Sequence, residues 1–194
     1  MAFANRYPGG TEVEISMLFV DVRDSSGLAE RTTAESFAGL MNCFYRTATE
    51  VLIDSDAIID KLVGDEVIGL FLPIFTGANH ARPALDAARQ LLVATGHAKE
   101  EGPWIPIGIG VHTGVAYVGT VSGTDETVSD ITALGDNVNI TARLASMAGP
   151  GEALISEAAF VAGGAPPGEL ERRRLSLKGK SEPVPVLVLR VSDA

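Results

Sequence analysis

Cysteine is nearly absent from the sequence: Cys43 is the single example among 194 residues. One cysteine excludes an internal disulfide and any cysteine-based zinc cluster. Long hydrophobic runs are also absent, and none approaches the roughly 18 residues that a membrane-spanning helix requires. Positive charge is scarce, since 15 Lys and Arg against 25 Asp and Glu give a formal net charge of −10. Such a surface repels phosphate backbones and anionic lipid, so we expect no nucleic-acid partner and no membrane partner.

A small nucleotide is still compatible with this charge, because a divalent metal can neutralise its phosphates locally. The rest of the composition is that of a globular domain, with 46% hydrophobic and 21% charged residues. The first ten residues, MAFANRYPGG, lack the charged and apolar regions of a secretory signal, which favours a cytoplasmic location. We predict a loose leader over residues 1–12 and one domain over residues 13–194.

Apolar periodicity predicts the order strand, helix, two strands, helix, strand in the first two thirds of the chain. The predicted ranges are a strand at 13–22, a helix at 34–53, a hairpin of 57–63 and 66–72, a helix at 78–97, and tightly joined strands at 105–114 and 115–121. This order predicts an α+β fold with a ferredoxin-like βαββαβ core, in which helices pack on one face of an antiparallel sheet.

The last third adds a helix and strands to this core. We predict a polar loop at 122–127, a strand at 128–134, a helix at 136–147, a strand at 152–156, a one-turn helix, a loop at 163–168 and a terminal hairpin around Gly179. His112 alternates within a strand, so we predict a structural role for it.

Two aspartates stand where strands end. Asp21 ends the apolar strand LFVDV, and Asp65 lies in the turn of the following hairpin. Each alone is an ordinary turn residue. In a split βαβ sheet, however, the first strand and this hairpin are neighbours, so the two carboxylates could converge. A pair of carboxylates suits Mg²⁺, which takes one or two from the protein and completes its shell with water and phosphate.

Two further sites carry charge into apolar segments. Lys61 lies in the strand IIDKLV, where it must reach solvent, a partner or a ligand, and strand alternation places Asp60 on the opposite face. In the predicted helix 136–147, Asn139 and Arg143 are four residues apart and share one face. They could stabilise charge on a transferring phosphoryl group. Alternatively, Arg143 simply pairs with an acid such as Asp136 or Glu152.

Five blocks together carry a family resemblance: LFVDVRDSSGLAE, IIDKLVGDEVIGLF, IGIGVHTGVAYVG, TALGDNVNITARL and LKGK. In this order and spacing they resemble the catalytic domain of class III nucleotidyl cyclases, over about residues 14–190. The resemblance implies that Asp21 and Asp65 bind metal, with the backbone carbonyl of Val22 assisting.

The same resemblance implies roles for the remaining positions. Lys61 and Thr132 would read the purine, a combination similar to adenylyl cyclases, whereas guanylyl cyclases tend to carry Glu and Cys there. Asn139 and Arg143 would orient the ribose and stabilise the transition state. Lys178 would hold the terminal phosphates, with Lys180 as the alternative. Residues 124–130 are acidic where many relatives carry a basic residue, which shifts phosphate binding towards Lys178.

The implied reaction is conversion of ATP to 3′,5′-cyclic AMP and pyrophosphate, by attack of the ribose 3′-hydroxyl on the α-phosphate with two Mg²⁺ or Mn²⁺ ions. The implied assembly is a homodimer whose sites lie between subunits, with the metal aspartates from one subunit and the purine, Asn and Arg groups from the other. Two alternatives remain at this point: a nucleotide-binding module without turnover, and a guanylyl cyclase.

Overall fold

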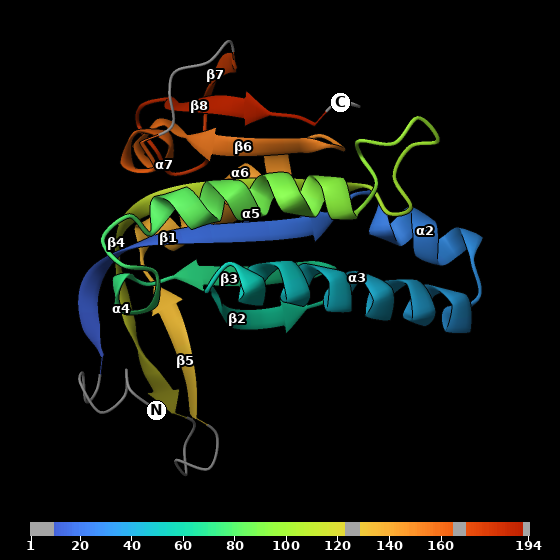
Figure 1. The fold of residues 1–194 in the computed structure, drawn as a ribbon, viewed down its shortest axis with the longest axis horizontal. Helices are drawn as coiled ribbons and strands as arrows, with labels where there is room; N and C mark the ends of the chain where they lie inside the picture. Colours follow the sequence, from blue (N-terminus) through green and yellow to red (C-terminus); the bar gives the residue numbers. More distant parts are fainter. Residues whose placement is uncertain (1–9, 123–128, 165–169, 192–194) are drawn as a thin grey trace.

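In the computed structural model of the chain, the strands of the described residues form one mixed, eight-stranded sheet (Figure 1). The structure describes residues 10–122, 129–164 and 170–191. In chain order the elements are β1 (Thr11–Val22), α2 (Ser25–Arg31), α3 (Ala34–Asp54), β2 (Ile58–Val63), β3 (Glu66–Phe71), α4 (Pro73–Thr76), α5 (Ala81–Ala94), β4 (Ile107–Ser122), β5 (Ser129–Leu134), α6 (Asp136–Met147), β6 (Glu152–Ser156), α7 (Glu157–Ala162), β7 (Glu171–Leu175) and β8 (Val184–Leu189).

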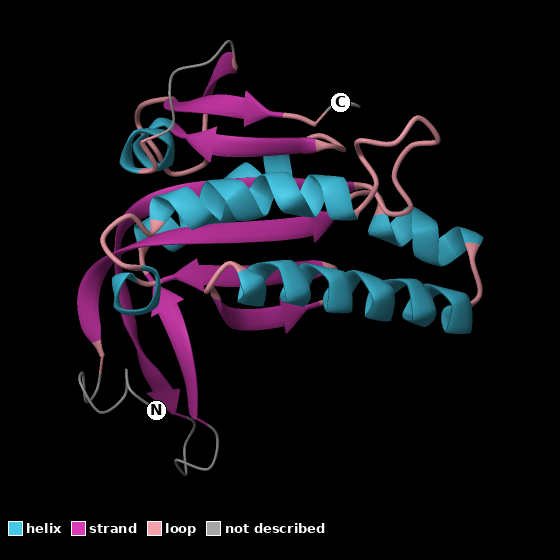
Figure 2. Cartoon of the chain, viewed as in Figure 1, coloured by secondary structure: helices cyan, strands magenta, loops and turns pink. Residues whose placement is uncertain are grey.

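The predicted βαββαβ core is confirmed as β1, α3, β2, β3, α5 and β4. The strands lie in the order β2-β3-β1-β4, and each adjacent pair is antiparallel. Helices α3 and α5 lie across one face of the sheet (Figure 2). Leu18 and Val20 of β1 point into that face and join the same core cluster as Phe44 of α3 and Leu91 of α5. The sheet is extended by β6, parallel to β4, and then by the antiparallel strands β8 and β7.

Helix α6 packs on the opposite face, so helices cover both sides of the sheet. Met17 and Phe19 of β1 share a core cluster with Ala145 of α6. Burial on both faces explains why β1 reads as a continuous apolar run rather than an alternating one. The close approach of α6 to the sheet depends on Gly110, where an added Cβ would lie 2.4 Å from the backbone nitrogen of Ala145.

Strand β4 corrects one prediction. Residues 105–114 and 115–121 do not form two strands, because β4 is continuous from Ile107 to Ser122. Gly114 does not mark a turn: an added Cβ there would lie 2.6 Å from Cγ of Asn137, so the glycine makes room for a side chain of α6. β4 pairs with β1 from Ile107 to Val118 and with β5 from Tyr117 to Ser122.

The ends of several predicted segments also differ. β1 begins at Thr11, inside the stretch predicted as a leader, and residues 1–9 lie outside the described part of the chain. Most of the predicted loops at 122–127 and 163–168 lie outside it as well. Helix 136–147, strand 152–156 and the terminal hairpin are confirmed.

None of the described helices has the length and apolar character needed to cross a bilayer.

An ion-pair network fastens the β6-β8-β7 extension. Arg173 of β7 donates to both carboxylate oxygens of Glu152, at 2.8 and 2.9 Å, and Arg190 donates to it at 2.5 Å. Glu171 joins the same two arginines at 2.6 and 2.9 Å. Because Glu152 is only 9% exposed, these bonds replace most of its hydration.

We expect Glu152→Gln to destabilise the fold in a pH-dependent way. The hydrogen bonds from Arg173 are the main reason that the pKa of Glu152 falls to about 2 from its ordinary value of 4.5. A carboxylate with a lowered folded-state pKa stabilises above its unfolded pKa, and this contribution is lost as the pH falls from about 4.5 towards 2. The variant should therefore lose about 2–3 kcal/mol in free energy of unfolding at pH 7.

Urea denaturation of the wild type and of Glu152→Gln at pH 7, 4.5 and 3.5 measures this effect. The difference between their free energies of unfolding should become smaller below pH 4.5. Glu157→Gln is the control, because Glu157 forms an exposed ion pair with Arg172 at 3.5 Å. Such a pair contributes about 0–1 kcal/mol. A difference in free energy of unfolding that stays constant with pH would contradict the lowered pKa of Glu152.

Candidate active site

Asp21 and Asp65 lie side by side at one end of the sheet. The Cα of Asp21 pairs in register with Glu66, the residue after Asp65, and the backbone N–H of Val22 donates to the carbonyl of Asp65 at 3.0 Å. In Figure 1 the end of β1 and the β2–β3 turn lie next to each other. The topology predicted this meeting, since β1 and β3 are neighbours in the sheet.

The surroundings of the two aspartates are rich in negative charge. Arg23 Nη2 lies 2.5 Å from Asp21 Oδ1, and the Ser25 hydroxyl donates to Asp65. Burial raises the pKa of Asp21, against the opposing effect of Arg23. Burial, followed by the charges of Asp21 and Asp65, raises the pKa of Glu66 to about 7. Three carboxyl groups thus face one guanidinium.

A divalent cation fits this donor set. Its charge would offset the excess negative charge, and Asp21 and Asp65 supply the hard oxygens that Mg²⁺ and Mn²⁺ prefer. In the described ranges no three His, Cys, Asp or Glu side chains are grouped closely enough to enclose an ion. Water and phosphate oxygens would therefore complete the shell, as is usual for Mg²⁺. Arg23, Ser25 and Glu66 were not singled out from the sequence, although each lies within four residues of a predicted ligand.

Lys61 of β2 and Thr132 of β5 are brought together from positions 71 residues apart. Lys61 Nζ donates to Thr132 Oγ1 at 2.7 Å. The expectation for Asp60 is wrong: it does not point to the opposite face. A β-bulge shifts the register between Ile59 and Lys61, which breaks the strand alternation. Asp60 Oδ2 consequently lies 3.5 Å from Lys61 Nζ and 3.3 Å from Thr132 Oγ1.

Asn139 and Arg143 project from α6. Asn139 is exposed, Arg143 is half-buried, and Gly179 in the loop between β7 and β8 lies beside the Arg143 guanidinium. The structural alternative for Arg143 is wrong, because Asp136 pairs with Lys180 and Glu152 pairs with Arg173 and Arg190.

Lys178 and Lys180 differ in their surroundings. Lys178 is exposed, and within the described part of the chain its ammonium makes no ion pair. Lys180 is already held by Asp136 at the start of α6. Lys178 is therefore the lysine of this loop that is available for a ligand.

A buried polar chain fixes the start of α6. Asn137 Nδ2 donates to the carbonyl of Val115 at 2.7 Å, and its Oδ1 lies 2.9 Å from His112 Nε2. The other ring nitrogen of His112 lies 2.8 Å from the Ser156 hydroxyl. His112 is thus satisfied on both sides, as its predicted structural role requires, and burial lowers its pKa. Asn137 was missed in the sequence, where only Gly114 opposite it gave a signal.

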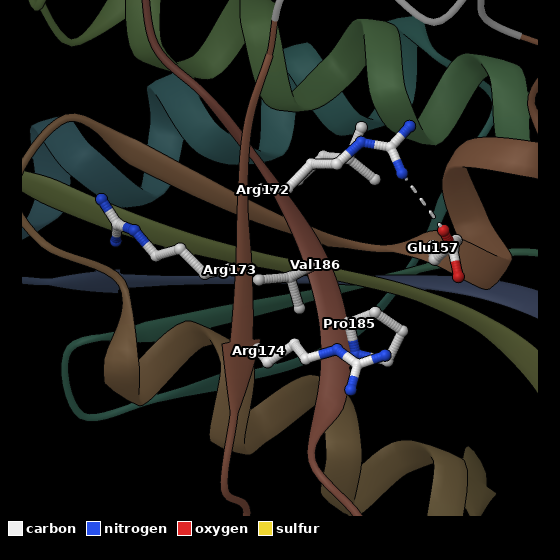
Figure 3. Close-up of a pocket in the computed structure, with 7 residues that line it drawn as sticks. Glu157, Arg172, Arg173, Arg174, Pro185 and Val186 are labelled. Atoms are coloured by element: carbon white, nitrogen blue, oxygen red, sulfur yellow. Dashed lines mark ion pairs between the residues drawn. The ribbon is translucent and has the colours of Figure 1, made fainter.

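The predicted site residues form separate groups within one chain. No hydrogen bond or ion pair of the described residues joins either aspartate to the other predicted side chains, which are Lys61, Thr132, Asn139, Arg143 and Lys178. A hollow of about 400 Å³ next to Asp65 is lined by Ser25, Ser26, Phe37 and Gly64 among others. Another hollow, of about 230 Å³, lies between α7 and the β7–β8 hairpin and contains none of the predicted site residues (Figure 3).

The chain belongs to the adenylate and guanylate cyclase catalytic domain family, whose sequence model matches residues 10–188. Domains of this family act on nucleotides, generally use divalent metal ions and usually dimerise.

Among curated proteins, the chain is 27% identical to adenylate cyclase 1 of Rhizobium meliloti (strain 1021) over 139 residues, which cover 69% of the chain and 21% of that protein. It is 30% identical to an adenylate cyclase of Anabaena cylindrica over 136 residues, which cover 67% and 26%. The chain thus spans about a quarter or less of the length of these relatives.

Solved structures share the whole fold. The guanylyl cyclase Cya2 has a TM-score of 0.84 at 22% identity, with 93% of each chain covered. The adenylyl cyclase CyaB from P. aeruginosa has a TM-score of 0.78 at 26% identity, with 93% of this chain and 95% of that chain covered.

Proposed function

We propose that the chain is an adenylyl cyclase that converts ATP to 3′,5′-cyclic AMP and pyrophosphate. The observation that carries this proposal is the 2.7 Å hydrogen bond between Lys61 and Thr132, which holds an ammonium donor beside a hydroxyl. Neither of the side chains that guanylyl cyclases tend to carry, Glu and Cys, stands at these positions. The adenylate cyclases among the relatives support the same choice.

The residues of the chain divide the work of this reaction. A bond forms between the ribose 3′-oxygen and the α-phosphorus, and the bond from that phosphorus to the bridging oxygen of pyrophosphate breaks. Asp21 and Asp65, with the Val22 carbonyl, would hold two Mg²⁺ or Mn²⁺ ions, which would activate the attacking oxygen and offset phosphate charge. Asn139 would orient the ribose, and Arg143 would stabilise the charge that develops on the α-phosphate.

The proposed active form is a homodimer with two sites related by a two-fold axis. Its support is the grouping described above. Among the described residues of one chain, no hydrogen bond or ion pair joins the aspartates to Lys61, Thr132, Asn139 or Arg143. Facing copies would place the aspartates of one opposite Lys61, Thr132, Asn139 and Arg143 of the other. The cytoplasmic location, the absence of nucleic-acid and membrane partners, and a catalytic domain over 13–194 remain predictions from the sequence.

The test is turnover of ATP and GTP by the purified chain, with Mg²⁺ and with Mn²⁺, at concentrations spanning dimer formation. We expect cyclic AMP as the main product, with activity per chain rising with protein concentration. Cyclic GMP as the main product would make the chain a guanylyl cyclase. ATP binding by a confirmed dimer without any cyclic product would make it a binding module.

Lys178→Ala should raise the KM for ATP by about 10- to 100-fold, with a smaller effect on kcat. The reason is that a charge-assisted bond to a phosphate contributes about 1.5–3 kcal/mol in both the bound ground state and the transition state. Lys180→Ala is the matched control, and we expect it to change KM less than Lys178→Ala does. Steady-state kinetics against ATP measure both, and a larger effect at Lys180 would transfer the role to that residue.

A further inference from the structure

Asp60 forms a side-chain cluster with Lys61 and Thr132, the two residues proposed to read the purine. The β-bulge at this position turns its carboxylate to the same side as Lys61, where it contacts both Lys61 and Thr132. The side chain of Asp60 is 5% exposed and Thr132 is 5% exposed, whereas the side chain of Lys61 is 41% exposed. Lys61 is therefore the outermost member, and the hydroxyl and the carboxylate lie behind it.

The chemistry of these three groups fixes the direction of every hydrogen bond between them. An ammonium can only donate, so Thr132 Oγ1 accepts from Lys61 at 2.7 Å. A carboxylate can only accept, so the Thr132 hydroxyl donates its single proton to Asp60 at 3.3 Å. The hydroxyl then has one lone pair left and no proton, and towards a ligand it can act only as an acceptor.

This cluster consequently presents a donor, the remaining N–H groups of Lys61, next to an acceptor, Thr132 Oγ1. The edge of adenine is the complement of this pattern, since its N1 accepts and its 6-amino group donates. The edge of guanine carries the reverse pattern, with N1–H as a donor and O6 as an acceptor. A mismatched edge would leave polar groups facing like groups beside the buried Thr132 and Asp60, which is costly.

We propose that Asp60 is a positioning residue for base selection: by holding the proton of Thr132, it makes the cluster accept the 6-amino group of adenine and reject O6 of guanine. This inference rests on the proposed function, because it assigns the base-recognition step of that reaction. Asp60 acts through Thr132 and Lys61 and need not touch the nucleotide.

The decisive variant is Asp60→Asn, which keeps the shape but supplies an amide N–H. That N–H can donate to Thr132 Oγ1, which frees the hydroxyl proton to face the ligand. We expect the ratio of kcat/KM for ATP to that for GTP to fall about 10- to 100-fold, mainly through KM, as for loss of a charge-assisted bond. Asp56→Asn is the matched control, because it removes the same charge from an exposed position four residues earlier and should leave the ratio unchanged.

Two further variants separate this role from a merely structural one. In a Thr132→Val background there is no hydroxyl to orient, so adding Asp60→Asn should no longer change the ratio. In an Asp60→Asn background, Thr132→Asp restores a group that only accepts, and the preference for ATP should return. Should Asp60→Asn fail to unfold cooperatively on heating, Asp60→Ser, which also lacks the carboxylate, replaces it.

Equilibrium binding of non-hydrolysable ATP and GTP analogues provides a second readout. If the wild type turns over neither nucleotide, the proposed function fails, and the ratio of analogue affinities still tests Asp60. An unchanged ratio in Asp60→Asn, or an equal change with and without the Thr132 hydroxyl, would overturn the inference.

Discussion

Replacing Asp21 with alanine is expected to lower cyclase activity by about 1,000-fold or more, even at saturating Mn²⁺. Metal ions that activate an attacking oxygen and neutralise phosphate charge supply several kcal/mol of transition-state stabilisation. Asp21 and Asp65 are the two aspartates that meet where β1 ends beside the β2–β3 turn, and Asp65 alone cannot hold two ions. Initial rates of cyclic AMP formation across a range of Mn²⁺ concentrations measure the loss.

The control distinguishes the loss of a metal ligand from a loss of folding. Asp24→Asn removes the same charge three residues later, where the backbone has a φ of 56° that asparagine tolerates, and it should retain activity. Thermal unfolding of Asp21→Ala should stay close to wild type, because the substitution removes a carboxylate whose pKa is raised by burial. Activity within tenfold of wild type would remove Asp21 from the site.

Mixing Asp21→Ala with Arg143→Ala should restore activity that neither variant has alone. If sites form between subunits, the heterodimer contains one site with both lesions and one with neither. Random pairing at equal concentrations makes half of the dimers heterodimers, so the mixture should regain about a quarter of wild-type activity. The assay is cyclic AMP formation after the two proteins are exchanged at dimer-forming concentrations.

A second mixture provides the control for this experiment. Asp21→Ala and Asp65→Ala both damage the metal group, so every site in their heterodimer carries one lesion and no recovery is expected. Recovery in the first mixture but not in the second requires a shared site. Absence of recovery in the first mixture, with heterodimers demonstrated, would place each site within one chain.

Much of the fold could be predicted because its signals are local. Apolar periodicity gave the order of the core elements, and the topology of a split βαβ sheet brought Asp21 and Asp65 together. The failures arose where distant side chains decide the outcome. Gly114 resembles a turn signal until Asn137 is seen to fill the space above it. Strand alternation predicts that Asp60 points away from Lys61, but the β-bulge at this position turns both side chains to the same side.

Ion pairing was the least predictable part of the site. Glu152 was a reasonable partner for Arg143 by charge, but it pairs instead with Arg173 of β7 and with Arg190, which directly follows β8. The sequence does not predict the register of these strands with β6. The sequence alone does not distinguish Lys178 from Lys180 as the phosphate-binding lysine. The structure does, because Asp136 pairs with Lys180. Non-local contacts of this kind have no signature in composition or periodicity.

The seating of α6 has a mechanical consequence. The helix packs directly on Gly110 and Gly114 of β4. Its first turn is held by the hydrogen bonds that join Asn137, His112 and Ser156. Sliding or tilting it would strip partners from buried polar atoms, so the helix travels with the sheet as a single rigid piece. In the proposed homodimer, activity would then be controlled by how two rigid subunits approach and rotate, and not by rearrangement within one subunit.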